Sequence, residues 1–253
     1  MAHNGLRMSR VEHPLIAVNG LLQASPGPAV RLDNRYAVAV QKAGGVPLVV
    51  PASAAPHDLD LLLERVDGLL LTGGDDFDTA RLGLGPTHPA ACITPPSKQD
   101  LDVLLAQKAL ERRMPVLGIC YGMQLLGLVG GARLLQHLPD DRPGARVHSG
   151  DVEHSVRIRT SSKLARLLGV EELPVVSRHH QALNDVTPPW TVAAVDDEGL
   201  VEAIERPDLP FAVGVQWHPE LAPEGSAHDR LFRGLVGAAG MAAAKDVLQR
   251  SRA

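Results

Sequence analysis

A run of 19 uncharged residues, Met114 to Ala132, constrains the fold of this chain more than any other segment. Its length reaches that of a membrane-spanning helix. However, Pro115 and five glycines interrupt the run, and Gln124 within it is polar. We therefore interpret it as a buried strand, Val116–Ile119, followed by a tight turn and a buried helix, and we predict no membrane association.

The turn inside that run has the sequence Gly118-Ile119-Cys120-Tyr121-Gly122, the cysteine version of the G-x-S-x-G nucleophile elbow. In such an elbow a strand enters a helix through a sharp turn that exposes the nucleophile above the sheet. The glycines two places before and after it prevent clashes. The N-terminus of the helix also favours a thiolate over a thiol. We therefore predict that Cys120 is a nucleophile rather than a core cysteine.

Short aliphatic runs alternate with helical patterns through the first half of the chain, which is typical of βαβ units. Beyond Pro139 the runs HSVRI, LPVVS, WTVAAV, LVEAIE and FAVGVQ are separated by turn residues and indicate antiparallel strands. The pattern predicts an α/β fold, in which a mostly parallel sheet has helices on both faces and antiparallel strands are added in the C-terminal half. Because no clean linker is present, residues 1–253 are expected to form a single domain.

Individual elements follow from the same patterns. The predicted strands are Leu15–Asn19, Val46–Val50, Gly68–Leu71 and Val116–Ile119. The predicted helices are Asn34–Ala43 with Asp33 as its cap, Asp58–Arg65, one from Ser97 with Asp100 completing a capping box, and one from about Ala227.

A cysteine nucleophile needs a base, and the base needs a group that orients it. The segment Trp217-His218-Pro219-Glu220 offers both. His218 is expected to face Cys120, while the Glu220 carboxylate accepts a hydrogen bond from the other imidazole nitrogen.

Acyl transfer also needs N–H donors for the developing oxyanion. The backbone of Tyr121, next to the nucleophile, is one expected donor. Gly74, in the glycine pair that follows Gly68–Leu71, is the other expected donor, because glycine lets the backbone approach a substrate closely.

Composition excludes several classes of protein. A net charge of −4 and 3% aromatic residues argue against a nucleic-acid partner. The two cysteines, Cys92 and Cys120, cannot form a disulfide framework, and the N-terminal residues contain no apolar signal segment. We therefore expect a cytoplasmic location.

The chain has eleven histidines, which raises the question of a zinc site formed by His148, His154, His179 and His180. No His-x-x-x-His or Cys-x-x-Cys pairing supports such a site. The adjacent His179 and His180 would also point to opposite faces of a strand. The aspartates after Gly74 lack the glycine and glutamate of a calcium loop, and no phosphate-binding glycine motif follows a strand. We predict no metal and no cofactor.

Five segments now carry a resemblance to a known family. GICYGMQLLGLVGGA and GVQWHPE resemble the glutaminase domain of class I glutamine amidotransferases. LTGGDDFDTARLG, SRHHQ and DDEGLVEAIERPDLPFAVGVQWHPE are similar to the free-standing γ-glutamyl-γ-aminobutyrate hydrolases. The resemblance extends from Leu15 to about Leu235. It implies a flavodoxin-like fold and a Cys-His-Glu triad that hydrolyses the γ-amide of glutamine or of γ-glutamyl compounds.

The resemblance assigns a role to eight residues. They are Cys120 as nucleophile, His218 as base, Glu220 as its orienter, Gly74 and Tyr121 at the oxyanion positions, and Gln124, Ser177 and His179 at the glutamyl pocket. Two positions depart from the family pattern. Tyr121 stands where an arginine commonly follows the nucleophile, and Val103 stands where a glutamate is expected. Both departures leave the triad intact and leave the identity of the leaving group open.

Three functions remain under consideration. The leading hypothesis is a hydrolase that cleaves small γ-glutamyl amines through a cysteinyl thioester and releases glutamate and an amine. The second is the glutaminase subunit of a two-chain amidotransferase that delivers ammonia to a synthetase. The third is a non-catalytic γ-glutamyl-binding protein, which the intact triad disfavours. The sequence leaves the oligomeric state open, a homo-oligomer included.

Overall fold

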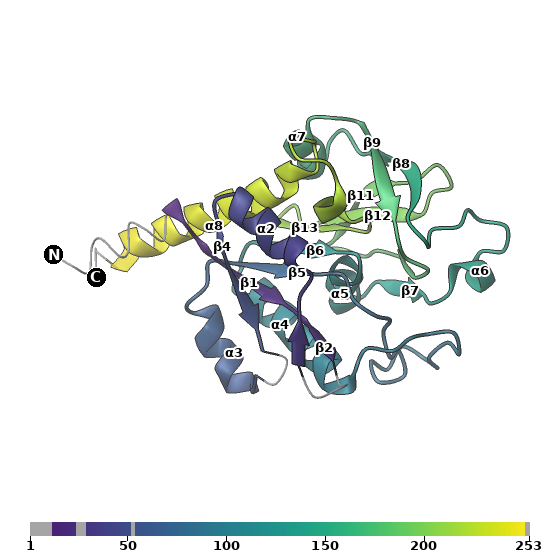
Figure 1. The fold of residues 1–253 in the computed structure, drawn as a ribbon, viewed down its shortest axis with the longest axis horizontal. Coiled ribbons are helices and arrows are strands. Elements are labelled where there is room, and N and C mark those ends of the chain that lie inside the picture. The colour runs from purple at the N-terminus through teal and green to yellow at the C-terminus, as the bar shows by residue number, and fades with distance from the viewer. Residues whose placement is uncertain (1–11, 24–28, 52–53, 251–253) are drawn as a thin grey trace.

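A nine-stranded sheet organises the molecule (Figure 1). The structure is a computed structural model that describes residues 12–23, 29–51 and 54–250. The strands are β1 Leu15–Asn19, β2 Leu21–Gln23, β3 Ala29–Arg31, β4 Val46–Val50, β5 Gly68–Leu71, β6 Val116–Ile119, β7 Arg133–Leu135, β8 Val152–Ile158, β9 Glu172–Ser177, β10 Ala182–Asn184, β11 Thr191–Val195, β12 Val201–Glu205 and β13 Ala212–Val215. The helices are α2 Asn34–Lys42, α3 Pro56–Leu63, α4 Pro96–Glu111, α5 Tyr121–Val129, α6 Leu138–Asp141, α7 Lys163–Leu168, the 3-10 helix η1 Pro219–Leu221 and α8 Asp229–Arg250.

The large sheet has a parallel part and an antiparallel part. Its strand order is β4-β1-β5-β6-β13-β12-β11-β8-β9. The first five strands in that order are mutually parallel, and the pairs from β13 onwards are antiparallel. This arrangement confirms the predicted fold class, and β1, β4, β5 and β6 have the predicted bounds.

Helices cover both faces of the sheet, because successive residues of a buried strand point to opposite sides. Leu117 and Ile119 of β6 pack in one apolar cluster with residues of α2, α7 and α8. Val116 packs in the other, with residues of α3, α4 and α5. Figure 1 shows α2 and α8 on one side of the parallel strands and α3 and α4 on the other.

The uncharged run forms β6, a single-residue turn and α5, as predicted. Every residue of β6 and most of α5 are buried. None of the helices in the described ranges has the length and apolar character needed to cross a membrane.

The first residues of α3 and α4 differ from the prediction, because both helices begin at a proline. α4 begins at Pro96 and its cap is Pro95, so the predicted capping box that begins at Ser97 is wrong. α3 begins at Pro56, two residues earlier than predicted. Proline favours the first helical position, because its φ is already helical and its missing N–H has no partner there. By contrast, the Asp33 side chain caps α2 as predicted, accepting the N–H of Arg35.

Candidate active site

Cys120 is the single residue between β6 and α5, and its backbone has φ 51° and ψ −107°. This is a strained conformation for a residue other than glycine, as in a nucleophile elbow. A Cβ on Gly118 would lie 2.6 Å from the carbonyl oxygen of Gly122, and a Cβ on Gly122 would lie 2.2 Å from that of Leu71. Both positions therefore require glycine for α5 to pack against the sheet.

His218 follows β13, the strand that pairs in parallel with β6. The pairing brings its side chain next to the thiol of Cys120, which raises the pKa of the imidazole. Its Nδ1 lies 2.7 Å from Oε1 of Glu220 in η1. The three predicted triad residues thus lie in one contiguous group. Cys120 is only 7% exposed, so the thiol is less accessible than the elbow pattern predicts.

The contacts of His218 control its protonation. Burial on its own lowers the pKa of this imidazole, but the hydrogen bonds and charges of Cys120 and Glu220 outweigh that effect and raise the pKa to about 10. His218 is therefore an imidazolium at neutral pH. This arrangement supplies a nucleophile and a proton donor side by side.

Tyr36 of α2 also contacts the triad, although it was not predicted as a site residue. Its hydroxyl accepts the N–H of Gly73 at 3.1 Å and lies 3.5 Å from Nδ1 of His218. Burial and the charge of Glu220 raise the pKa of this hydroxyl well above its usual value, so it remains neutral. The available signal was the spacing of Tyr36 and Val40, the two residues that α2 buries.

The glycine pair after β5 lies against the triad. A Cβ on Gly73 would come within 2.9 Å of Cε1 of His218, and a Cβ on Gly74 would come within 3.2 Å of Cγ of Tyr121. The N–H of Gly73 is donated to Tyr36. Within the described residues, the N–H groups of Gly74 and Tyr121 have no hydrogen-bond acceptor. These two donors are therefore available to an oxyanion at Cys120.

The side chain of Tyr121 packs in the core. Its ring stacks on Phe77 with centroids 4.3 Å apart, and the Lys98 ammonium lies 5.8 Å from its centroid. Burial, and then the charge of Asp102, raises the pKa of its hydroxyl well above the usual range. Lys98 and Asp102 form a buried ion pair. Tyr121 can therefore offer its backbone N–H, but not its side chain, to a substrate.

Gln124 belongs to a chain of side-chain amides that ends at the thiol. Its Nε2 donates to the carbonyl of Gln181 at 2.9 Å and to Oε1 of Gln216 at 3.1 Å. Nε2 of Gln216 in turn lies 3.5 Å from the sulfur of Cys120. Gln216 was not predicted as a site residue, although it comes directly before Trp217-His218.

Ser177 and His179 are both buried and engaged with groups of the protein. The Ser177 hydroxyl donates to the carbonyl of His148 at 2.7 Å. Nδ1 of His179 donates to the carbonyl of Gln181 at 2.9 Å, and its Nε2 faces Glu202. Burial and the nearby His148 lower the pKa of His179 to about 3, so its ring is neutral.

Two arginines lie near the triad on the solvent side. Arg178 is partly exposed and hydrogen bonds with Asp151. Arg35 is paired with Asp33. The charges of both arginines interact with Glu220. Two arginine–aspartate pairs therefore lie next to the triad.

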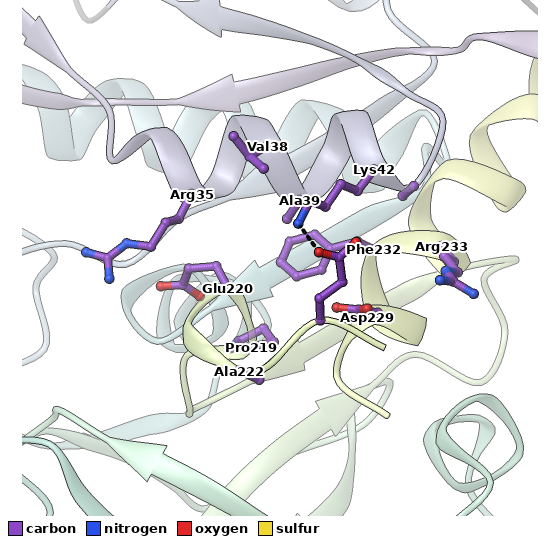
Figure 2. A pocket seen from close by; sticks show the side chains of 12 residues that line it. Arg35, Val38, Ala39, Lys42, Pro219, Glu220, Ala222, Asp229, Phe232 and Arg233 are labelled. Atoms are coloured by element: carbon purple, nitrogen blue, oxygen red, sulfur yellow. Dashed lines mark hydrogen bonds and ion pairs between the residues drawn. The ribbon is translucent and has the colours of Figure 1, made fainter. Parts of the chain in front are cut away.

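A cleft between α2, η1 and α8 borders Glu220, and Figure 2 shows Arg35 and Lys42 on one wall and Asp229 and Phe232 on another. Cys120 and His218 are not among its lining residues. This cleft therefore reaches the orienting carboxylate and not the thiol.

Comparisons with known proteins identify the family and the fold. The family model described as Peptidase C26 matches residues 14–220. A Mycobacterium tuberculosis protein named as a candidate glutamine amidotransferase is 38% identical over 216 residues, which cover 84% of this chain and 68% of that protein. The γ-glutamyl-γ-aminobutyrate hydrolase of Escherichia coli O157:H7 is 34% identical over 243 residues, 90% of this chain and 94% of that protein. The glutaminase domain of Trypanosoma brucei CTPS, solved with bound acivicin, superposes with a TM-score of 0.66 at 19% identity and covers 90% of this chain and 94% of its own.

Proposed function

The chain belongs to the Peptidase C26 family, the class I glutamine amidotransferase-like hydrolases, and from this premise we propose that it hydrolyses γ-glutamyl amides through a cysteinyl thioester. One observation carries the proposal. Cys120 sits in a strained elbow, beside an imidazolium that Glu220 orients at 2.7 Å. A buried structural cysteine needs none of these features.

The first half-reaction follows from the positions of Cys120 and His218. The thiolate attacks the γ-carbonyl carbon, and the oxygen takes up the negative charge facing the N–H groups of Gly74 and Tyr121. His218 then gives its proton to the amine nitrogen as the C–N bond breaks. The products are a free amine and a glutamyl thioester on Cys120.

The second half-reaction uses the imidazole that the first leaves neutral. A water molecule transfers a proton to His218 and attacks the thioester carbon. The C–S bond breaks, and glutamate leaves. Cys120 is again a thiolate beside an imidazolium. Glu220 holds the same imidazole tautomer throughout.

The leaving group is set by the charges near the triad. Tyr121 replaces the family arginine, and its buried ring cannot reach a substrate. His179 is buried and neutral and cannot replace the missing charge. Arg178 is partly exposed and electrostatically coupled to Glu220. We therefore propose that Arg178 recognises a carboxylate on the leaving amine, as in γ-glutamyl-γ-aminobutyrate.

The experiment compares kcat/KM for γ-glutamyl-γ-aminobutyrate and for γ-glutamyl-butylamine, with release of glutamate as the readout and no partner protein present. Arg178→Gln should lower kcat/KM for the acidic substrate by about 10- to 100-fold, because a hydrogen bond to a charged group contributes about 1.5–3 kcal/mol. The neutral substrate should change by less than about threefold. Arg166→Gln, at an exposed arginine on α7, is the matched control and should change neither.

Two results would contradict the proposal. An equal effect of Arg178→Gln on both substrates would remove its role in leaving-group recognition. If the wild-type chain turned over no γ-glutamyl amide alone but gained glutaminase activity with a synthetase chain, the protein would be an amidotransferase subunit.

A further inference from the structure

Three buried histidines surround one buried glutamate beside the proposed active site. We refer to His148, His154, His179 and Glu202 as the histidine cluster. Each is less than 7% exposed, and Glu202 is fully buried. None of the four takes part in the proton transfers described above. The residues come from the segment before β8, from β8 itself, from the segment after β9 and from β12.

The ring nitrogens converge on one carboxylate oxygen. Oε1 of Glu202 lies 3.8 Å from Nδ1 of His148, 3.7 Å from Nε2 of His154 and 3.6 Å from Nε2 of His179. The ligand atoms of His148, His154 and Glu202 all lie within 4.8 Å of one another. Both carboxylate oxygens of Glu202 lack a hydrogen-bond donor, and so do the two Nε2 atoms. These separations are too long for hydrogen bonds.

Backbone carbonyls determine which nitrogens carry hydrogen. Nδ1 of His154 lies 3.2 Å from the carbonyl of Ser155, and Nδ1 of His179 lies 2.9 Å from the carbonyl of Gln181. Because a carbonyl only accepts, each Nδ1 carries the hydrogen and each Nε2 of a neutral ring presents a lone pair to Glu202. The ring of His148 has different neighbours: its Nε2 lies 3.4 Å from Oδ2 of Asp196, and its Nδ1 lies 3.4 Å from Oγ of Ser177 as well as 3.8 Å from Glu202.

A carboxylate that faces the nitrogen lone pairs of His154 and His179 in the interior is unfavourable unless a proton or a metal ion lies between them. A proton on Glu202 can be donated to only one nitrogen at a time and would need a shorter contact than 3.6 Å. A metal ion can contact all of the groups at once. Two ligand atoms of a tetrahedral zinc ion lie about 3.4 Å apart, a few tenths of an ångström closer than Oε1 of Glu202 lies to the ring nitrogens here.

We propose that the histidine cluster is a binding site for Zn²⁺, with His148, His154 and Glu202 as ligands and with Nε2 of His179 facing the same carboxylate oxygen. Imidazole nitrogens with one carboxylate oxygen suit zinc better than calcium or magnesium, which prefer oxygen ligands. The carbonyls of Ser155 and Gln181 hold the second nitrogens of His154 and His179, as outer groups commonly do around zinc-bound histidines.

Strand pairing explains why the cluster lies where it does. β11 pairs with β8 only at Arg157 and Ile158. The register between β11 and β12 shifts on both sides of Ala194, opposite the part of β12 that contains Glu202. His154 therefore belongs to the part of β8 beyond the pairing with β11. An ion at the cluster would connect β8 to β12 at this point.

The same ion would position groups next to the thiol. The Gln181 carbonyl accepts from both His179 and Gln124. The backbone carbonyl of Glu202 accepts the N–H of Gln216, whose side chain contacts Cys120. The role inferred for the metal is therefore structural, since it holds the segments that support the proposed active site.

The test is metal binding by the full chain. After treatment with EDTA and gel filtration, the protein is titrated with Zn²⁺. The bound metal is then measured by inductively coupled plasma mass spectrometry. We expect about one ion per chain, as in other closed zinc sites. With Zn²⁺ at 100 times its Kd, the Tm should rise by about 5–10 °C. Co²⁺ in place of Zn²⁺ should give the visible bands of a four-coordinate site.

Four variants locate the ion. His154→Gln and Glu202→Gln should lose the bound metal. His228→Gln, at a buried histidine outside the cluster, should retain it. His137→Gln tests the other group with metal-binding geometry, His88, His137 and Asp140, which is partly exposed.

The proposal is overturned if the wild-type chain binds no Zn²⁺ or if His137→Gln abolishes binding. Retention of a full equivalent by both cluster variants would also overturn it. Should the cluster variants fail to fold, metal content, the Co²⁺ spectrum and the His137→Gln control still decide the question.

Discussion

The contact between the backbone at Gly73 and the catalytic imidazole can be tested by adding a single methyl group. In Gly73→Ala the new Cβ would lie 2.9 Å from Cε1 of His218 and 3.0 Å from the hydroxyl of Tyr36. Ordinary contacts of a Cβ begin at 3.4 Å, so the imidazole must retreat by about half an ångström. The ring is also held by Glu220 at 2.7 Å, and it cannot move without loosening that bond.

A displacement of this size should affect catalysis more than stability. Catalytic groups need placement within about 0.5 Å, and a 1 Å error costs about 100-fold in rate. We therefore expect kcat/KM for glutamate release to fall by about 10- to 100-fold, or about 1.4–2.7 kcal/mol in transition-state free energy. The reaction of Cys120 with iodoacetamide should slow as well, because it depends on the neighbouring imidazolium.

The control for Gly73→Ala is Gly237→Ala, on the exposed face of α8, where a Cβ would meet nothing within 4 Å. It should leave both rates unchanged. The reasoning is refuted if Gly73→Ala folds normally and keeps kcat/KM within about twofold of the wild-type value. In that case the backbone after β5 would not restrain the imidazole.

Three further predictions follow from the site. Cys120→Ser should lower kcat by at least about 10³-fold, whereas Cys92→Ser, at the exposed cysteine, should leave it unchanged. Because the pKa of His218 is raised to about 10, its protonation should stabilise the fold fully below about pH 6.5 and lose this effect as the pH rises through 10. Glu220→Gln removes a charge that raises this pKa, so the loss should be smaller and end at lower pH, as measured by thermal unfolding at a series of pH values. Gly122→Ala should destabilise the protein by about 1–3 kcal/mol or more in denaturant titrations, because its Cβ would overlap backbone atoms.

Each of these predictions has an outcome that would contradict it. Loss of activity in Cys92→Ser would contradict the assignment of Cys120 as the nucleophile. Identical pH profiles in the wild type and Glu220→Gln would mean that Glu220 does not hold the charge on His218. If Gly122→Ala were as stable as the control Gly237→Ala, the close approach of α5 to β5 would be wrong.

The fold could be predicted where local patterns decide it. β1, β4, β5 and β6 are short, almost wholly aliphatic and bounded by turn residues, so their bounds were predicted correctly. The start of α4 was predicted wrongly. Serine is a common helix cap, which favoured Ser97, but the helix begins at Pro96 and is capped by Pro95. Both signals were present in the sequence, and their relative strength depends on the path of the preceding loop.

The site was predicted where neighbouring residues carry the chemistry together. The elbow around Cys120 and the pair of His218 and Glu220 are each contiguous in sequence, and the sheet brings them together. Tyr36 and Gln216 were missed because their roles depend on which partner they meet across the fold.

The histidine cluster was not predicted as a metal site, for the same reason. Its members span residues 148 to 202, and no two have the spacing of a zinc motif. Only the meeting of β8 and β12, with the segments after β9 and before β8, brings them to one point. The expected opposite orientation of His179 and His180 is found, since His180 pairs with Asp76 at 3.0 Å.

The close approaches at Gly118 and Gly122 also limit how this chain can evolve. Every missense change of a glycine codon adds at least a Cβ, and at both positions that atom would fall within 2.6 Å of a backbone oxygen. Backbone cannot yield as a flexible side chain does, so no single substitution at either position is neutral to packing. The partly exposed side chain of Arg178 carries no such restriction. Relatives of this chain can therefore change their preference for the leaving group of the substrate through substitutions at such exposed positions, while the elbow that performs the chemistry is retained.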